Sequence, residues 1–161
     1  CERLGPELKK QGLIFVGMMA GYGLWSDIRR DIMPIQTVAT DGEIIVPRAE
    51  DGHYYLTLTI NGMPIPFMVD TGASGMVLTL DDAERLGIDR DSLNFFGEAQ
   101  TANGTVRTAM VTLPLVELGP FRTNDFRAFV NQGQMEGSLL GMDYLGQFEL
   151  EFRSGQLSLR Q

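Results

Sequence analysis

The sequence is poor in the residues that build disulfides and metal centres. Among its 161 residues are one cysteine, Cys1, and one histidine, His53. A single cysteine cannot form an intrachain disulfide, and a site of four cysteines or of mixed cysteines and histidines is excluded. Any Ser-His-Asp or Cys-His mechanism would depend on His53, which follows a turn and fits a structural or exposed role better. We therefore expect no metal and no cofactor.

Positive charge is also scarce. The chain carries 13 basic and 21 acidic residues, for a formal net charge of -8, so it offers no electrostatic basis for binding nucleic acid. Glycine is plentiful, with 19 residues against 7 prolines, which suits an all-β chain with many turns. The length allows one domain and an appendage.

Long apolar runs are few, and the clearest one covers residues 12–25, which include no charged side chain. This run is shorter than the roughly 20 residues that span a bilayer comfortably. Lys10 can extend to one interface while Trp25 and Arg29 anchor the other, which lengthens the usable helix to residues 9–28. We expect a single-pass membrane anchor within residues 1–30. The core of a signal peptide and a buried segment of the fold are the alternatives.

Within this predicted anchor, Gly17 and Gly21 have the spacing that lets membrane helices pack closely. Glycine is common in such helices, so the spacing can also be incidental; an integral membrane protein is a candidate partner. Basic residues flank both ends almost equally, and we favour a cytoplasmic N-terminus with the soluble part in the periplasm. Residues 31–42 show no apolar period and are expected to form a linker.

Strand and turn patterns fill residues 43–161, the predicted soluble domain. Residues 54–60 alternate with the period of a half-buried strand. Asn61-Gly62 and Asn103-Gly104 are hairpin signals. Residues 79–87 are expected to form the one short helix, because a threonine can cap its start and a glycine can end it. Further strands are expected at residues 43–47, 63–69, 76–79, 93–101, 105–118, 121–131, 148–152 and 156–159.

The rest of the domain is organised around the turn that follows the strand ending in Phe-Met-Val. There Asp70 enters the tight segment Thr71-Gly72-Ala73-Ser74, and a second apolar run comes next. A carboxylate at the end of a buried strand is costly unless hydrogen bonds or chemistry justify it. Thr71, Ser74 and the backbone N–H groups around Gly72 can donate to Asp70. An Asx-type turn between two strands is the structural alternative.

Three segments together resemble the retropepsin-like aspartic proteases. They are the Asp70-Thr71-Gly72 loop, the glycine-tipped hairpin Ala102-Asn103-Gly104-Thr105, and the apolar segment Leu139-Leu140-Gly141 before a short helical turn. They occur in the order of that group, and the similarity covers most of residues 43–161. The pattern Thr-Ala-Asn-Gly followed by Leu-Leu-Gly-Met-Asp-Tyr-Leu looks most like bacterial single-domain members, many of which carry an N-terminal membrane anchor. The resemblance implies an all-β closed barrel with one short helix, preceded here by the transmembrane helix.

The same resemblance implies roles for individual residues. Asp70 would be catalytic, supported by the turn Thr71-Gly72-Ala73-Ser74. The hairpin at residues 102–105 would be a flap that closes over an extended peptide substrate. Leu139 and Leu140 would wall the catalytic loop, and Gly141 would let a backbone pass close to it.

The implied mechanism needs two carboxylates that share one proton, one activating water and the other protonating the carbonyl oxygen. The sequence has a single Asp-Thr-Gly, which predicts a homodimer in which each chain contributes one Asp70. The chain is thus expected to be a membrane-anchored aspartic endopeptidase. A catalytically silent accessory subunit of a membrane complex is the second hypothesis, and a peptide-binding module without hydrolysis is the third.

Two features depart from the family pattern. Many flaps of the family carry an aromatic residue, but no tyrosine or tryptophan lies between Tyr55 and Tyr144. Retroviral enzymes also interleave their terminal strands to form the dimer, whereas here the N-terminus leads into the predicted anchor. Asp143 is the tempting second carboxylate within one chain, and we expect it instead to cap the turn at Tyr144-Leu145.

Overall fold

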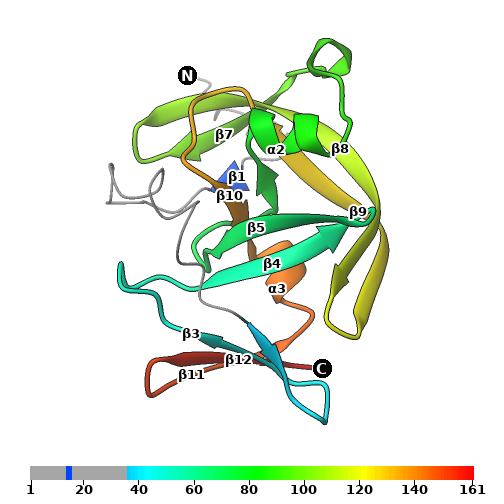
Figure 1. Cartoon of the computed structure of the whole chain (residues 1–161). Coiled ribbons are helices and arrows are strands. Elements are labelled where there is room, and N and C mark those ends of the chain that lie inside the picture. The colour runs from blue at the N-terminus through cyan, green and yellow to red at the C-terminus, as the bar shows by residue number, and fades with distance from the viewer. Residues whose placement is uncertain (1–13, 16–35) are drawn as a thin grey trace, which may run out of the picture.

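The structure, a computed structural model, describes residues 14–15 and 36–161 (Figure 1). Two short α-helices and one 3-10 turn accompany the strands of this part of the chain: α2 (Leu80–Arg85), η1 (Arg90–Ser92) and α3 (Met142–Leu145). The strands are β1 (Ile14–Phe15), β2 (Thr37–Val38), β3 (Ile44–Pro47), β4 (Tyr55–Ile60), β5 (Met63–Val69), β6 (Val77–Leu78), β7 (Gly97–Thr101), β8 (Gly104–Leu118), β9 (Phe121–Asn131), β10 (Ser138–Leu140), β11 (Glu149–Arg153) and β12 (Gln156–Arg160).

The strands form two sheets. The larger has the order β1-β7-β8-β4-β5-β10-β6-β9, and β8 pairs with β9 as well. The hydrogen-bonded strands therefore form a ring, which runs from β8 through β4, β5, β10, β6 and β9 and back to β8. The smaller sheet has the order β11-β12-β3-β2 and lies at the opposite end of the molecule from the β7–β8 hairpin tip (Figure 1).

Local sequence explains the hairpin that leads to Asp70. β4 buries Leu56, Leu58 and Ile60 on the core side, as its alternating pattern predicts. Asn61 and Gly62 take positive φ angles of 49° and 83°, which a two-residue hairpin turn requires. The register Ile60↔Met63 then brings β5 back along β4. The predicted hairpin is thus confirmed.

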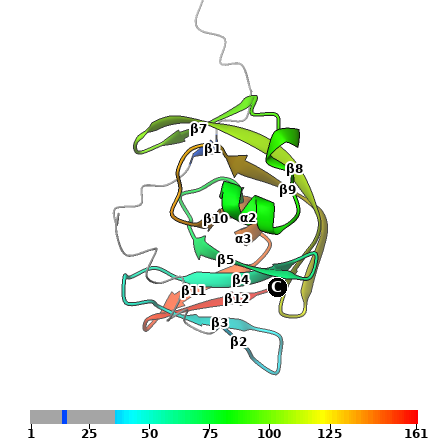
Figure 2. The same ribbon diagram turned by 45° about the horizontal axis from the view of Figure 1, so that its top comes forward.

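The position of β10 matters most for the site. It inserts between β5 and β6, the strands on either side of the Asp70 loop. Leu140 pairs with Val69 in parallel, and Leu139 pairs with Val77 in antiparallel. Figure 2 shows β10 at the centre of the molecule, beneath the β7–β8 hairpin. A segment far along the chain is therefore a direct neighbour of the catalytic loop candidate.

The helix predicted at residues 79–87 is confirmed as α2, with Thr79 as its N-cap accepting from the Asp82 N–H. The four-residue α3 is a second short helix of the described chain. The strand predicted at residues 93–101 begins only at Gly97, and residues 93–96 between η1 and β7 form no strand. In the next hairpin Thr101 pairs with Gly104, so the turn residues are Ala102 and Asn103, one position earlier than the Asn-Gly signal suggested.

The predicted anchor, with Gly17 and Gly21, lies almost entirely outside the described residues. Its two described members, Ile14–Phe15, form a strand that pairs in parallel with Ala99 and Gln100, in place of the expected helix. None of the helices in the described chain has the length and apolar character needed to cross a bilayer. Part of the predicted linker 31–42 belongs to the smaller sheet, since β2 pairs with β3.

Candidate active site

Asp70 stands at the end of β5, in a loop whose backbone is tightly hydrogen-bonded. One carboxylate oxygen, Oδ1, accepts from the Gly72 N–H at 2.8 Å, and the Ala73 N–H donates to the Asp70 carbonyl at 3.1 Å. The other oxygen, Oδ2, is buried and has no hydrogen-bond partner among the described residues. The Gly72 N–H is thus one of the donors predicted for this carboxylate. Thr71 and Ser74 are exposed at the rim of the loop, and Ala73 is buried.

The segment Leu139-Leu140-Gly141 holds this loop from below. The Asp70 N–H donates to the Leu140 carbonyl at 3.0 Å, and the Met142 N–H donates to the Ala73 carbonyl at 2.8 Å. A Cβ on Gly141 would lie 2.4 Å from the Gly75 carbonyl oxygen, so only glycine fits this crossing. The predicted close passage of two backbones is therefore present, next to Asp70.

Asp143 does not cap α3 as predicted. The N-cap is Gly141, which supplies no side-chain hydrogen bond. The Asp143 N–H instead donates to the Ser74 carbonyl at 3.1 Å, and its Oδ2 lies 3.5 Å from where a Cβ on Gly75 would stand. Asp143 lies two residues after the N-cap position, inside the first turn of α3, and its backbone contact serves the Asp70 loop.

A cleft of about 540 Å³ opens between the tip of the β7–β8 hairpin and residues 132–137. Three elements surround it: the β7–β8 hairpin, the start of α2, and the loop of residues 132–137. Its apolar lining comes from Leu80, Val106, Met135 and Leu139. Asp70 is not among the lining residues, and Leu139 of β10 connects the cleft to the catalytic loop. The cleft can hold a peptide side chain, because it combines apolar walls with polar groups at its edges.

The predicted flap residues occupy the tip of the β7–β8 hairpin. Ala102 and Asn103 line the cleft, whereas Gly104 and Thr105 are exposed on the start of β8. The Thr101 hydroxyl closes the turn by donating to the Gly104 carbonyl at 2.7 Å. Gly104 has a φ of +115°, a conformation that side-chain-bearing residues rarely adopt.

A small apolar cluster connects the base of the flap to the strands of the loop. Its buried members are Tyr55, Met68, Val77, Ala99 and Leu139. Ala99 comes from the flap strand β7, and Leu139 also lines the cleft. The cluster therefore joins the flap, the cleft and the Asp70 loop in one packed unit.

A polar group lies at the edge of this cluster. The Tyr55 hydroxyl donates to Asp51 Oδ2, and the Nδ1 of His53 is 3.5 Å from Asp51 Oδ1. Burial and the Asp51 carboxylate raise the pKa of Tyr55 well above its usual range. The His53 backbone N–H also donates to Asp51 Oδ1 at 2.9 Å, a local structural contact of the kind that its position in the sequence suggested.

The cleft residues outside the three motifs were not predicted from the sequence. The segment of residues 132–137 was predicted only as a loop, and the start of α2 only as a helix start. No local pattern could reveal that these segments meet, because they are joined through strand pairing of β6 with β9 and β10. In the described part of the chain, no group of three or more His, Cys, Asp or Glu side chains is arranged to hold a metal ion.

Comparison with known proteins identifies the family. Residues 56–147, which contain the Asp70 loop, the flap hairpin and the Leu139-Leu140-Gly141 segment, match the family described as "gag-polyprotein putative aspartyl protease". This match covers more than half of the chain. The chain belongs to this aspartyl protease family.

Two relatives of this aspartyl protease family member are described as uncharacterized proteins. One, encoded in the cobV 5′ region of Sinorhizobium sp, is 38% identical over 77% of this chain and 56% of its own length. The other, from Rickettsia prowazekii (strain Madrid E), is 34% identical over 89% of this chain and 65% of its own length. The chain therefore spans less than two thirds of each relative.

Solved structures agree with the aspartyl protease family. The crystal structure of a retropepsin-like aspartic protease from Rickettsia conorii is 39% identical, with a TM-score of 0.68 over 73% of this chain and 98% of that one. The EIAV protease complexed with the inhibitor HBY-793 is 22% identical, with a TM-score of 0.51 over 61% of this chain and 89% of its own. The retroviral protease-like domain of Ddi1 from Leishmania major is 22% identical, with a TM-score of 0.51 over 66% of this chain and 87% of that domain. The fold is retropepsin-like.

Proposed function

We propose that this chain is an aspartic endopeptidase whose catalytic group is Asp70. The observation that supports this most is the state of its carboxylate. One oxygen is hydrogen-bonded to the Gly72 N–H, while the buried second oxygen has no partner among the described residues. A buried carboxylate oxygen without a donor is costly. A shared proton from a second carboxyl would satisfy it and would create the acid–base pair.

The pair would work as one unit. Two carboxylates in contact cannot both ionise, so one keeps a proton at working pH. The ionised member would take a proton from water, which attacks the peptide carbonyl, and the protonated member would donate to the carbonyl oxygen. The pair would titrate with apparent pKa values that belong to both groups together. Hydrolysis of this kind needs no cofactor.

A second copy of the chain would supply the second Asp70. The terminal strands are engaged within the chain, since β12 pairs with β11 on one side and with β3 on the other. Interleaving of β12 with a partner would therefore require these pairings to break. We infer that the two copies meet through the exposed part of the Asp70 loop, where Thr71 and Gly72 are accessible.

The substrate would be an extended peptide or protein segment held under the flap. The outer edge of β7 supports this, because it pairs with an extended segment, Ile14–Phe15, at Ala99 and Gln100. An edge that accepts one extended segment can accept another by the same backbone hydrogen bonds. The cleft between the flap and residues 132–137 would receive a substrate side chain.

We also propose that residues 1–30 anchor the domain in a membrane as a single span, with the soluble domain in the periplasm. The apolar run of residues 12–25 supports the span, and Gly17 and Gly21 support packing against an integral membrane partner. A helix across the bilayer and the pairing of β1 with β7 use the same residues. They are therefore mutually exclusive states of this segment.

A silent accessory subunit of a membrane complex is the second candidate. It is favoured by the pairing of β12 on both sides within one chain, which removes the dimer contact that retroviral enzymes use. In that case Asp70 would face no partner, and no peptide would be cleaved. The flap without tyrosine or tryptophan supports the same alternative.

Replacement of Asp70 tests the function directly. We expect Asp70→Asn to lower cleavage of an unstructured protein substrate in mildly acid buffer by about 1,000-fold or more, because an amide cannot share a proton as a carboxyl pair does. Asp125→Asn is the matched control, since Asp125 is exposed and its φ of +50° suits asparagine. Cleavage by Asp70→Asn at the rate of the control would refute the assignment.

A further inference from the structure

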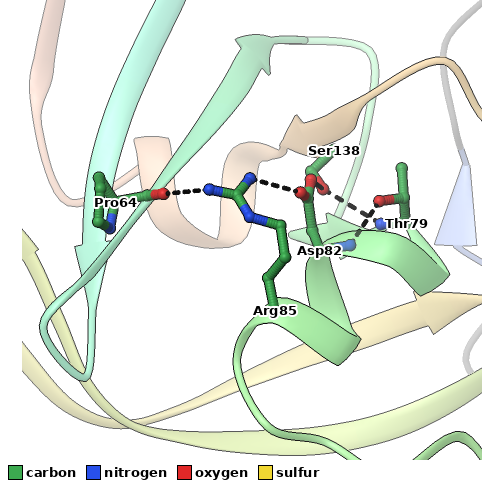
Figure 3. Close-up of polar contacts among 5 residues, drawn as sticks. All are labelled: Pro64, Thr79, Asp82, Arg85 and Ser138. Atoms are coloured by element: carbon green, nitrogen blue, oxygen red, sulfur yellow. Dashed lines mark hydrogen bonds and ion pairs between the residues drawn. The ribbon is translucent and has the colours of Figure 1, made fainter.

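A buried polar network connects α2 with β10 behind the wall of the cleft. Asp82 and Ser138 are both fully buried, with 0% exposure. The Ser138 hydroxyl donates to Asp82 Oδ2 at 2.6 Å and accepts from the Thr79 N–H at 3.1 Å. Figure 3 shows the two side chains meeting between the helix and the strand. Such a charge-assisted bond inside the protein is short and strong.

The Asp82 carboxylate has a second, outer contact. Arg85 donates from Nη1 to Asp82 Oδ1 at 3.2 Å and from Nη2 to the Pro64 carbonyl at 3.2 Å. The Arg85 side chain is 46% exposed, so solvent weakens this contact. Asp82 therefore has a strong inner bond to Ser138 of β10 and a weaker outer bond to Arg85. Arg85 also contacts the Pro64 carbonyl near the start of β5 (Figure 3).

The residues after Ser138 lead straight to the site. Leu139 lines the cleft, and the Leu140 carbonyl accepts from the Asp70 N–H at 3.0 Å. On the helix side, Thr79 lines the same cleft and caps α2. The buried carboxylate is thus bonded to the same short strand, β10, whose last residue holds the Asp70 backbone.

We propose that Asp82 and Ser138 are positioning residues: their bond fixes β10 against α2 and so sets Leu139 in the cleft and the Leu140 carbonyl under Asp70. The catalytic consequence rests on the proposed peptidase function, whereas the effect on the Asp70 loop does not. A purely structural role predicts something different, namely a loss of stability spread over the whole domain. The Asp70 amide distinguishes the two, because its hydrogen bond to Leu140 lies within the site.

Amide hydrogen exchange of the full chain tests the positioning role without any substrate. In Ser138→Ala we expect exchange at the Asp70 amide to accelerate about 10-fold or more, the effect of losing a hydrogen bond to a charged group. The exchange rates of the amides of β8 and β9 around Leu113, which pairs with Phe126 in strands that contain no residue of the network, should change less than about 2-fold. Arg85→Ala is the matched control, because it removes only the outer contact. Its exchange rate at the Asp70 amide should stay within about 3-fold of wild type.

Equal acceleration at Asp70 and around Leu113 in Ser138→Ala would overturn the proposal, since it would indicate global destabilisation. Equal acceleration at Asp70 in Ser138→Ala and Arg85→Ala would overturn it as well. Should Ser138→Ala not fold, Asp82→Asn replaces it, because asparagine has nearly the same shape but removes the charge that strengthens the bond from the Ser138 hydroxyl. Acceleration at Asp70 above that of Arg85→Ala supports the proposal, and acceleration equal to it refutes the proposal.

Steady-state kinetics separate this inference from the proposed function. If the chain cleaves peptides, Ser138→Ala should lower kcat about 10-fold with a smaller change in KM, because Asp70 loses its position more than the cleft loses its shape. Arg85→Ala should keep kcat within about 2-fold of wild type. A wild-type chain that cleaves nothing refutes the function, while the exchange result still decides the positioning role.

Discussion

Single residues show how little room the Asp70 loop leaves. Gly141 passes so close to Gly75 that a Cβ would stand 2.4 Å from its carbonyl oxygen and 2.7 Å from its backbone nitrogen. Backbone atoms cannot move aside as the end of a flexible side chain can. The sequence predicted that Gly141 lets two backbones pass closely. The position of β10 between β5 and β6 shows that the second backbone is that of Gly75.

We expect Gly141→Ala to lower the free energy of unfolding by about 2–4 kcal/mol, the cost of overpacking against a fixed backbone. Gly87→Ala is the control, because Gly87 has a φ of +80° but open space where a Cβ would stand. The Gly87→Ala variant should lose only about 1 kcal/mol of unfolding free energy, because its backbone is strained but its Cβ meets no other atom. Urea denaturation measures both, and equal losses would contradict the close passage.

Asp51 gives a pH dependence at the same scale. Burial alone raises its pKa, but hydrogen bonds from the Tyr55 hydroxyl and the His53 N–H, with the nearby imidazole, outweigh burial and bring the pKa below the ordinary value of 3.8. The folded state thus favours the carboxylate. The resulting stabilisation is fully present above the unfolded pKa and is lost as pH falls through the folded pKa.

Consequently, the urea midpoint of Asp51→Asn should lie below that of wild type at about pH 5, and the difference should shrink at about pH 2.5. Glu149→Gln, on the exposed face of β11, serves as the control and should show little difference at either pH. A gap between Asp51→Asn and wild type that stays constant over this range would show that the carboxylate form is not favoured by folding.

Elements carry the next level of organisation, and α2 is the clearest case. Its start was readable from the sequence, because Thr79 stands just before it and two acids follow in its first turn. What the sequence did not reveal is that this start also forms one wall of the cleft. A six-residue helix has few bonds of its own, so its cap contributes much of its stability.

Loss of this cap should therefore be measurable. Thr79→Ala removes the acceptor for the Asp82 N–H, which lies at 3.0 Å, and should cost about 1 kcal/mol of unfolding free energy. Thr79→Ser keeps the hydroxyl and should recover most of the loss. Thermal or urea unfolding of the two variants decides, and a Thr79→Ser variant as unstable as Thr79→Ala would point to the lost methyl group instead of the cap.

At the scale of the whole molecule, the proposed site is incomplete in one chain. Asp70 has a buried oxygen with no partner among the described residues, and β12 in the smaller sheet is paired on both sides by strands of the same chain. Assembly through the loop of Asp70 would complete the pair of carboxylates. The closed barrel expected from the sequence remains a prediction, beside the observed ring of strand pairing.

If two copies form the site, specific activity per chain should rise with protein concentration and then level off. Dilution below the dissociation constant should abolish cleavage, and sedimentation should show the dimer over the same range. Mixing wild type with an excess of Asp70→Asn should suppress activity, because mixed dimers carry one carboxyl instead of two. Activity per chain that is independent of concentration in a sedimenting monomer would rule out the paired site.

The fate of residues 1–30 is a second prediction for the whole chain. Expressed in bacteria, the full chain should remain with membranes after washing with high salt, whereas a chain starting at residue 36 should not. Charged substitutions at Gly17 and Met18 should release the full chain, because a charge in the centre of a span is costly. Release of the unchanged chain by salt alone would contradict the anchor.

The sequence by itself determined what depends on neighbours along the chain. The hairpin at Asn61-Gly62, the helix capped by Thr79 and the turn after β5 follow from local conformational preferences and from the alternation of apolar residues. It also determined that Asp70 is the one carboxylate in an Asp-Thr-Gly turn.

Only the tertiary structure decided which distant segments meet. Ser138 bonds to Asp82 across 56 residues, β10 lies between the two strands of the catalytic loop, and residues 132–137 face the flap across the cleft. These contacts arise when strands pair and bury a common core, and pairing partners are selected by the whole set of strands and not by any one of them. For this reason the Asp70 loop could be found from its own residues, whereas the bond between Ser138 and Asp82 could not.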